Sequence, residues 1–396
     1  MANTPSPKPG HAIQSAPTMP CILHLIDETT ADDSLITLRQ LIRRLPRPQY
    51  RHILGVVGRM ATPVWAAGSA RVLRFGWRLG WVPTTALPVR AAIRDGGAQI
   101  IHAWSDTTAA VAQLAASGDC RVVVTVGTPP ARRAWSKWWA AFGGLPSSPA
   151  PAIVCPSRLF FRRAIEAGIP TIRCGVIRPA ADFSAINEAR RTMDRAVLGI
   201  SEGAPVLLTP SPPSRPGGHY CAVWAAAVLQ QIWPGLRIIL PGESTECRRL
   251  QRFAASFRQP DLLITTGRRF EFEQLLVLAD LVVVPAIGDV SAGAVAWAMA
   301  AGVPVVGSAV PSVAEYIADH QNGLLCKPGK PMVLAARIRA AMGDIALMRR
   351  LTETARGQAF EVFGLTRLVN QYRTLYDNVL RGRHAFEGVT DAAIVA

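Results

Sequence analysis

Short runs rich in Val and Ile, separated by longer helical stretches, restrict how this chain can fold more than any other feature. In the first half these runs lie at 21–26, 52–57, 98–103, 121–126 and 152–155. They show little polar alternation, which is typical of parallel strands buried on both faces. Helical periodicity marks the intervals at 33–45 and 107–116. Strand followed by helix, repeated in this way, predicts a doubly wound parallel sheet.

The same pattern begins again after residues 178–204, where we place a hinge. The new runs lie at 205–209, 236–240, 261–265, 281–285 and 303–307. A chain of 396 residues is long enough for two domains. The predicted fold is therefore α/β, with two Rossmann-like domains facing across a cleft and ligands at the carboxyl ends of the strands.

The predicted domains are a basic N-terminal domain over 19–178 and a second domain over 179–365. Residues 366–382 follow as a helix that we expect to return to the first domain. One face of it carries Leu368, Tyr372, Leu375, Tyr376 and Val379. Residues 1–18, rich in Pro and polar side chains, are expected to form a disordered tail, and 383–396 a second tail.

Composition narrows the class of protein. Hydrophobic residues make up 49% of the chain, which argues against disorder as the main state. The apolar runs are too short for a spanning helix, and the first 20 residues lack the apolar core of a signal peptide. The seven cysteines have no CxxC spacing, so we expect neither a disulfide framework nor a zinc site. These features predict a cytoplasmic protein.

The net charge of +16 is concentrated in the first half. Residues 19–178 contain 20 Arg and Lys against 8 Asp and Glu, whereas 179–396 contain 22 against 19. Such a field favours an anionic partner, meaning lipid headgroups, nucleic acid or a phosphorylated substrate. The charge alone does not choose among these.

A specific motif lies at 279–325. A strand that ends in Pro285 leads into an acidic loop, residues 298–306 read AMAAGVPVV, and residues 322–325 read NGLL. This stretch resembles the donor-binding region of family 4 glycosyltransferases, which have the GT-B fold. The resemblance implies transfer of a hexose from a nucleotide diphosphate sugar to a lipid-linked or polysaccharide acceptor. It implies no metal, and no cofactor apart from the nucleotide sugar as substrate.

The resemblance also implies where the donor would bind. Ser291, Ala292 and Gly293 open the helix after the acidic loop and could offer backbone N–H groups to the diphosphate, although helix capping alone also explains them. Gly242 and Arg268 would line the donor side. Glu315, in the turn before NGLL, is expected to support that loop.

Two positions of the family's E-x7-E pattern differ here, because they hold Asp289 and Trp297. Asp289 is a shorter carboxylate that can still meet a sugar hydroxyl, and we predict a catalytic role for it. Trp297 cannot accept a hydrogen bond from a ribose. Its indole either stacks on the donor or packs in the core.

The family's two diphosphate-binding cations are also replaced. Alignment through the run at 205–209 puts Pro212 and Gly217 at their positions. Arg215 and His219 lie nearby as substitutes, with a solvated loop residue as the other interpretation of Arg215. Since a charged hydrogen bond is worth about 1.5–3 kcal/mol, losing both cations would weaken phosphate binding.

Two further loops depart from the family. Asp32 and Asp33 stand near its Gly-Gly, where they either begin a helix or repel a diphosphate. After the run at 121–126 the family has a His, whereas this chain has Gly127, Thr128 and Pro129. His102, which ends the preceding run, is either a catalytic residue or a satisfied strand-end residue.

These replacements leave two functions open. The first is a glycosyltransferase that uses a nucleotide diphosphate sugar. The alternative is a catalytically impaired relative that acts as a scaffold or partner subunit. No Ser/His/Asp, metal-ligand or P-loop pattern points to a different chemistry.

Residues 131–142 read ARRAWSKWWAAF and form a candidate membrane patch. Its aromatic residues share one helical face and have basic neighbours, which suits a helix in the interface of an anionic membrane. The patch consists of Trp135, Trp138, Trp139, Phe142, Arg132, Arg133 and Lys137. The segment 71–81 repeats this chemistry. Packing of the aromatics into the domain is the alternative, and without a recognisable module we expect no nucleic-acid partner.

Overall fold

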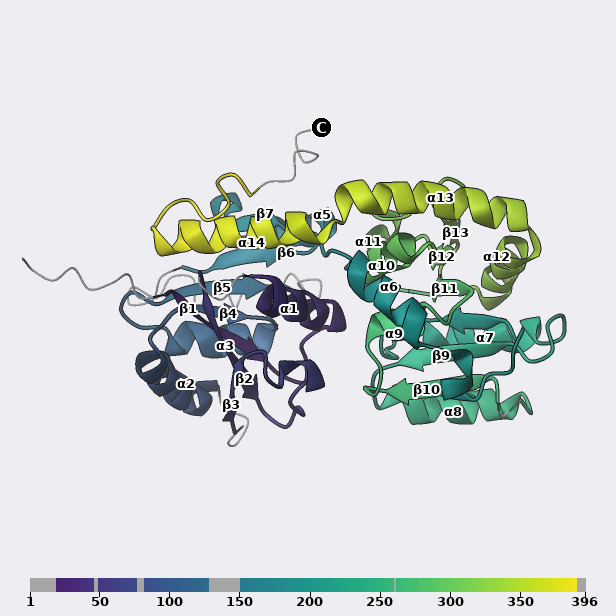
Figure 1. The fold of residues 1–396 in the computed structure, drawn as a ribbon, viewed down its shortest axis with the longest axis horizontal. Coiled ribbons are helices and arrows are strands. Elements are labelled where there is room, and N and C mark those ends of the chain that lie inside the picture. The colour runs from purple at the N-terminus through teal and green to yellow at the C-terminus, as the bar shows by residue number, and fades with distance from the viewer. Residues whose placement is uncertain (1–18, 46–48, 77–81, 128–149, 260, 390–396) are drawn as a thin grey trace, which may run out of the picture.

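The computed structural model describes residues 19–45, 49–76, 82–127, 150–259 and 261–389. The chain forms two halves, each built on one parallel sheet (Figure 1). The first sheet runs β3 (Arg71–Phe75), β2 (Arg51–Val57), β1 (Cys21–Ile26), β4 (Ala98–Ala103), β5 (Arg121–Thr125), β6 (Ala152–Cys155) and β7 (Cys174–Val176). The second runs β10 (Leu263–Gly267), β9 (Arg237–Pro241), β8 (Val206–Leu208), β11 (Leu281–Val284), β12 (Val305–Ser308) and β13 (Leu324–Cys326).

Helices join successive strands in both halves. The first half contains α1 (Asp32–Arg44), α2 (Val82–Gly96), α3 (Asp106–Ala115) and α5 (Arg158–Glu166). The second contains α6 (Phe183–Thr192), α7 (His219–Leu229), α8 (Glu246–Ser256), α9 (Phe272–Leu276), α10 (Gly293–Ala301), α11 (Pro311–Ala314), α12 (Pro331–Gly343) and α13 (Ile345–Val362). The helix α14 (Leu365–Leu380) follows.

The Val- and Ile-rich runs form the interior strands of the two sheets. All six residues of β1 are buried, and β1 pairs in parallel with both β2 and β4. Strands covered by helices on both faces need apolar side chains on both faces, which explains the absence of alternation. The predicted fold class, two Rossmann-like α/β domains, is therefore confirmed.

Three edge elements were not predicted as strands: β3, β7 and β13. Residues 71–75 belong to the segment that we interpreted as interfacial, but they form β3 at the edge of the first sheet, in register with β2. β3 carries Arg71 and Arg74, and β7 and β13 have three residues each, so none of these three edge strands shows the long apolar run of a central strand. Residues 77–81 of that segment lie outside the described residues, as do 1–18 and 131–142.

The last helix packs on the first sheet. Leu368, Tyr372, Leu375, Tyr376 and Val379 of α14 belong to one apolar cluster with side chains of β1, β2 and β4. In Figure 1 this helix lies over the N-terminal half, although α13 just before it lies over the other half. The chain therefore crosses between the halves twice. The two crossings are joined because the amide of Ala181 donates to the carbonyl oxygen of Phe363 at 3.0 Å.

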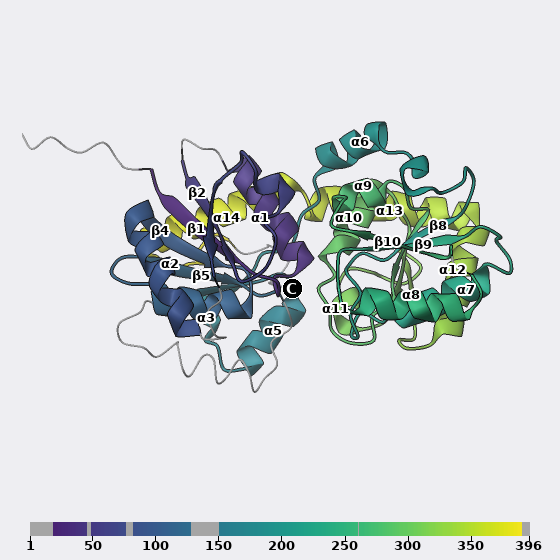
Figure 2. The ribbon, with the colours of Figure 1, turned by 90° about the horizontal axis from the view of Figure 1, so that it is seen from below.

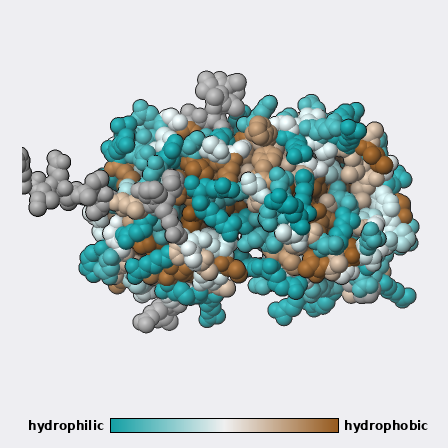
Figure 3. Space-filling model, in the orientation of Figure 1, coloured by the Kyte–Doolittle hydropathy of each residue, from teal (hydrophilic) through white to brown (hydrophobic). Residues whose placement is uncertain are grey.

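Helix α1 faces the second half across the boundary. Both ribbon views place α1 beside the boundary, with α9 and α10 on the other side (Figures 1 and 2). In the space-filling view, hydrophilic side chains cover most of the visible face and apolar areas appear on both halves (Figure 3). The site described next lies at this boundary, at the carboxyl ends of β8, β9 and β10.

Candidate functional site

A cavity of about 210 Å³ lies between the two halves. The first half contributes Asp32, Leu35, Ile36 and Arg39 of α1 and residues 60–65 of the loop after β2. The second half contributes Pro210, Pro241, Gly242, Gly267, Arg268, Phe270, Glu271 and Phe272. The cavity therefore combines apolar walls with a few charged groups, as small-molecule sites do. Gly242 and Arg268 are the predicted donor-site residues that line it.

Gly242 allows two loops to come together at the floor of this cavity. Its φ of +71° lies in the left-handed region, and a Cβ there would clash with the ring of Pro212. Its amide donates to the carbonyl oxygen of Gly267 at 2.9 Å. The loops after β9 and β10 are thereby tied together.

The N-terminus of α10 is bound by a carboxylate from the other half. One oxygen of Asp33, Oδ2, accepts a hydrogen bond from the Ser291 hydroxyl at 2.5 Å and another from the Gly293 amide at 2.9 Å. A Cβ on Gly293 would lie 2.9 Å from that oxygen, so glycine permits the close approach. Burial raises the pKa of Asp33, and the hydrogen bonds from Ser291 and the α10 backbone partly offset this.

Arg39 makes a second contact between the halves. Its guanidinium, only 3% exposed, reaches Glu271 at 2.5 Å and Glu273 at 2.9 Å. Both carboxylates lie on the second half, at the start of α9. Burial raises the pKa of Glu271, while the charge of Arg39 lowers it in part. Because Arg39 already faces two carboxylates, its charge is largely neutralised at the cavity wall.

Asp32 brings a further negative group to the cavity. Burial raises the pKa of this carboxyl to about 6, an effect that Arg268 reduces and Asp33 increases. Arg268 thus balances a carboxylate of this chain before any ligand enters. The sequence showed both acids at the start of α1, but not that Asp33 would bind the opposite half.

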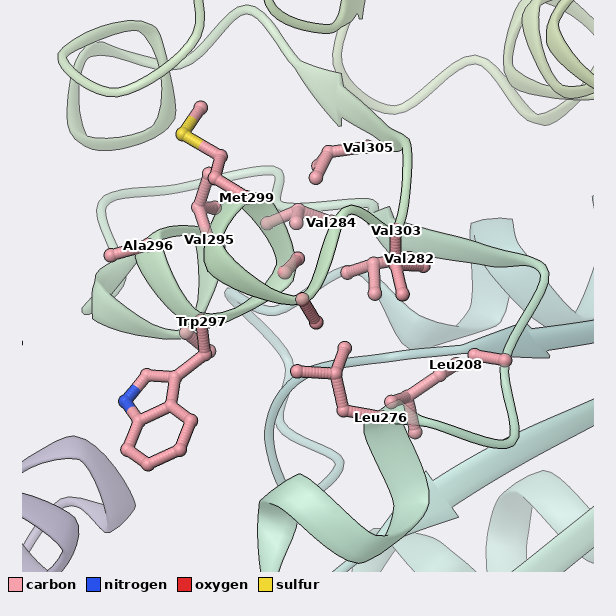
Figure 4. Packing of buried hydrophobic residues seen from close by; sticks show 14 of the residues in the cluster. Leu208, Leu276, Val282, Val284, Val295, Ala296, Trp297, Met299, Val303 and Val305 are labelled. Carbon is pink, nitrogen blue, oxygen red and sulfur yellow. The ribbon is translucent and has the colours of Figure 1, made fainter. Parts of the chain in front are cut away.

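Trp297 lies behind the cavity wall. Its indole is 1% exposed and meets the ring of Phe272 edge-on, with centroids 6.5 Å apart. In Figure 4, Trp297 and Met299 project from opposite sides of α10. Phe272 lines the cavity, so Trp297 supports its wall as part of the apolar cluster. Of the two interpretations of this residue, the arrangement favours core packing.

The two candidate cations of the loop after β8, Arg215 and His219, do not line the cavity. Arg215 is exposed. His219 is 1% exposed, and its Nδ1 accepts from the amide of Ser214 at 3.3 Å, so its Nε2 donates to the Ser211 carbonyl oxygen at 3.0 Å. Burial lowers the pKa of His219. This imidazole holds its own loop together.

Asp289 and Glu315 both contact α5 of the first half. Asp289 Oδ2 lies 3.2 Å from the guanidinium of Arg163. Glu315 accepts from the amides of Arg158 at 2.8 Å and Leu159 at 3.1 Å, and so caps α5. We expected Glu315 to support its own loop; the contact to the other half was not visible in the sequence. Ala292, buried, is the N-cap residue of α10.

His102 lies in the core of the first half, beneath α14. It is fully buried, with Nδ1 at 2.7 Å from the Tyr376 hydroxyl and Nε2 at 2.8 Å from the Thr125 hydroxyl. Its ring stacks on Trp104 with centroids 4.0 Å apart. Burial lowers the pKa of His102 well below its ordinary value. The geometry therefore favours the interpretation as a satisfied strand-end residue.

Within the described ranges, His, Cys, Asp and Glu side chains do not gather in groups of three that could hold a metal ion. Over the same ranges, none of the helices combines the length and the apolarity needed to cross a bilayer. The candidate membrane patch at 131–142 lies outside these ranges, so its interpretation stays a prediction.

The two halves define the class of protein. Residues 36–184 match the family model described as Glycosyltransferase Family 4, and residues 191–358 match the model described as Glycosyl transferases group 1. The chain is thus similar in sequence to family 4 and group 1 glycosyltransferases along most of its length, and it has their GT-B fold.

Individual relatives point the same way. The chain is 28% identical over 145 residues to N-acetyl-alpha-D-glucosaminyl L-malate synthase of Bacillus anthracis. This match covers 37% of this chain and 38% of that protein. It is 26% identical over 197 residues to D-inositol 3-phosphate glycosyltransferase of Nocardia farcinica (strain IFM 10152), covering 45% and 42%. The match therefore spans less than half the length of these relatives.

A solved structure shares the fold over nearly the whole chain. The crystal structure of Anabaena Alr3699/HepE in complex with UDP-glucose superposes with a TM-score of 0.73 at 18% identity, covering 90% of this chain and 99% of that one. This likeness shows the common architecture of two facing Rossmann-like halves.

Proposed function

We propose that this protein is a glycosyltransferase that transfers a hexose from a nucleotide diphosphate sugar to a lipid-linked or polysaccharide acceptor. The observation that carries the proposal is the cavity between the halves, with Gly242, Gly267 and Arg268 at the carboxyl ends of β9 and β10. In open α/β sheets this is where ligands bind. The Anabaena neighbour with the same fold is a complex with UDP-glucose, which supports a nucleotide sugar as the ligand class.

The proposed donor arrangement uses both sides of this boundary. The nucleoside would enter the cavity beside Arg268 and Phe270, and the diphosphate would lie toward Ser291 and the N-terminus of α10. Backbone N–H groups there stabilise the negative charge that develops on a diphosphate leaving group. Asp289, in the loop between β11 and α10, would meet a sugar hydroxyl after releasing Arg163.

Isothermal titration with UDP, GDP, ADP and their sugar conjugates tests this proposal. We expect one of these nucleotides to bind with a dissociation constant below millimolar. Binding should weaken about tenfold or more in Arg268→Ala, because a charge-assisted hydrogen bond is worth about 1.5–3 kcal/mol. If none of the nucleotides binds at millimolar concentration, the proposal fails.

A second function, that of a catalytically impaired partner or scaffold subunit, is favoured by one specific observation. The groups that would bind the diphosphate have other partners or face solvent. Asp33 accepts the hydrogen bonds of Ser291 and Gly293, Arg215 is exposed, and His219 bonds to its own loop. An assay of sugar transfer and donor hydrolysis distinguishes the two functions. Turnover that disappears in Asp289→Ala would exclude the impaired subunit.

The acceptor side and the location remain part of the same proposal. We expect a cytoplasmic protein that binds peripherally to the inner face of an anionic membrane through residues 131–142. Flotation with vesicles containing anionic lipid should retain the protein, and replacing Trp135, Trp138 and Trp139 by Ala should release it. Unchanged flotation of that variant would remove the patch from the proposal.

A further inference from the structure

The start of α10 is an anion-binding position whose anion is supplied by this chain. Three polar groups converge on Asp33: the Ser291 hydroxyl and the backbone amides of Gly293 and Ala294. Amides at the start of a helix carry partial positive charge and favour an anion. All nine residues of α10 are buried, and the glycine at its first position lets the Asp33 carboxylate come close to the backbone.

A phosphate would need these same donors. A hydroxyl and an amide each carry one hydrogen, so they cannot serve Asp33 Oδ2 and a phosphate oxygen fully at once. The space is equally limited, since a Cβ on Gly293 would already meet Pro179 at 2.7 Å and Asp33 at 2.9 Å. The Asp33 carboxylate and a phosphate bound to the same groups would also repel each other.

The anion-binding position adjoins the cavity. Asp32, the residue before Asp33, lines that cavity, so a ligand inside it lies next to the first turn of α1. A nucleoside in the cavity and a phosphate at α10 would therefore belong to one molecule that displaces Asp33 on entry.

We propose that Asp33 is an intramolecular competitor of the donor diphosphate. The carboxylate occupies the α10 N-terminus when the site is empty, and diphosphate binding requires it to leave. The contact thereby keeps the two halves together without a ligand and lowers the affinity for diphosphates. This inference rests on the proposed function for the identity of the natural ligand, but not for the competition itself.

Titration of the full chain with pyrophosphate and with UDP tests the competition. Asp33→Ala frees the Ser291 hydroxyl and the α10 amides, and it should tighten pyrophosphate binding by about tenfold or more. One charged hydrogen bond is worth about that factor. Asp33→Asn keeps a neutral acceptor and should give a smaller gain. Asp32→Asn is the matched control, because it removes the same charge from the same helical turn without touching α10.

Each result decides the matter. A gain in Asp33→Ala that exceeds the gain in Asp32→Asn supports the competition, whereas equal gains show a general charge effect and overturn it. An unchanged affinity in Asp33→Ala also overturns it. If that variant does not fold, Asp33→Asn against Asp32→Asn gives the same comparison.

Hydrogen exchange of the amides at 293 and 294 gives an independent measurement. In Asp33→Ala these amides should exchange faster than in the parent and become protected when pyrophosphate is added. Failure of the proposed function looks different: Asp33→Ala would bind pyrophosphate tightly, yet no variant would bind a nucleotide sugar. Failure of the competition alone would leave nucleotide sugars binding equally to the parent and to Asp33→Ala.

Discussion

The carboxylate of Glu315 accepts a hydrogen bond from the backbone amide of Arg158 at 2.8 Å, so a turn of the second half caps a helix of the first. Asp33 makes the reverse contact, from the first half to α10 of the second. Each half therefore lends a carboxylate to a helix start on the other. Water can replace hydrogen bonds of this kind, so the two contacts hold the halves together without making their union permanent.

Removal of the Glu315 carboxylate tests how strongly it holds α5. Glu315→Ala should lower the free energy of unfolding in urea by about 1–3 kcal/mol, because two partly buried amides lose their acceptor. Glu353→Ala is a suitable control, since its carboxylate on α13 is 65% exposed and pairs with Arg349, which is 80% exposed. That control should change the free energy by less than about 0.5 kcal/mol. Equal effects of the two variants would contradict the capping role.

Truncation of Trp297 tests whether it supports the cavity wall. Trp297→Ala should lower the free energy of unfolding by about 3–5 kcal/mol, as expected for a large side chain removed from a packed core. Trp297→Phe should fold and bind a nucleotide with an affinity within about twofold of the parent, because the indole lies behind Phe272. A large loss of binding in Trp297→Phe, with stability retained, would show direct contact with the donor.

Arg39 offers a test of a buried ion pair between the halves. Arg39→Met leaves Glu273, 8% exposed, without its cation, so the unfolding free energy should fall by about 3–5 kcal/mol. Adding Glu273→Gln should recover much of that loss. Arg44→Met is the matched control on the same helix, since Arg44 is 49% exposed. It should change the free energy of unfolding by less than about 1 kcal/mol. No recovery in the double variant would contradict the pairing.

Asp32 should make stability depend on pH. Its pKa is raised to about 6 by burial, so the folded protein binds the proton more tightly than the unfolded chain does. The contribution of this group to stability is therefore fully present below about pH 4 and is lost as the pH rises toward 6. Asp32→Asn should remove the dependence and stabilise the protein at pH 7 by roughly 1–2 kcal/mol, after allowance for solvent screening.

Urea unfolding of the parent and of Asp32→Asn from pH 4 to 7 measures this difference. Asp95→Asn is the control, because that side chain is 72% exposed. A difference between the parent and Asp32→Asn that stays constant over the range would show that the carboxyl titrates normally in the folded protein.

The central strands were predictable because their burial leaves a local mark. β1 and β11 are buried throughout, and their runs of Leu, Ile and Val are visible without any neighbour. The docking face of α14 was visible for the same reason, as apolar residues on one side of a helix. β3 left no such mark, since an edge strand with Arg71 and Arg74 draws its stability from pairing with β2.

The contacts within the site were not predictable from local sequence. Asp33 and Ser291 are 258 residues apart, and Arg39 and Glu273 are 234 apart. An acid in the first turn of a helix satisfies that helix by itself, so nothing in the sequence signals a partner on another element. Trp297 was ambiguous for a related reason, because stacking on a ligand and packing in a core both need only an indole.

The paired crossings near Ala181 and Phe363 have a mechanical consequence. A single connecting segment would let the two halves rotate about any axis. Two connecting segments joined by a hydrogen bond restrict the rotation to one axis. Opening would then be a rotation about that joint, and the start of α10 lies close to it, because a Cβ on Gly293 would come within 2.7 Å of Pro179. The contact between Asp33 and α10 therefore lies near the rotation axis, where the halves separate least as they turn.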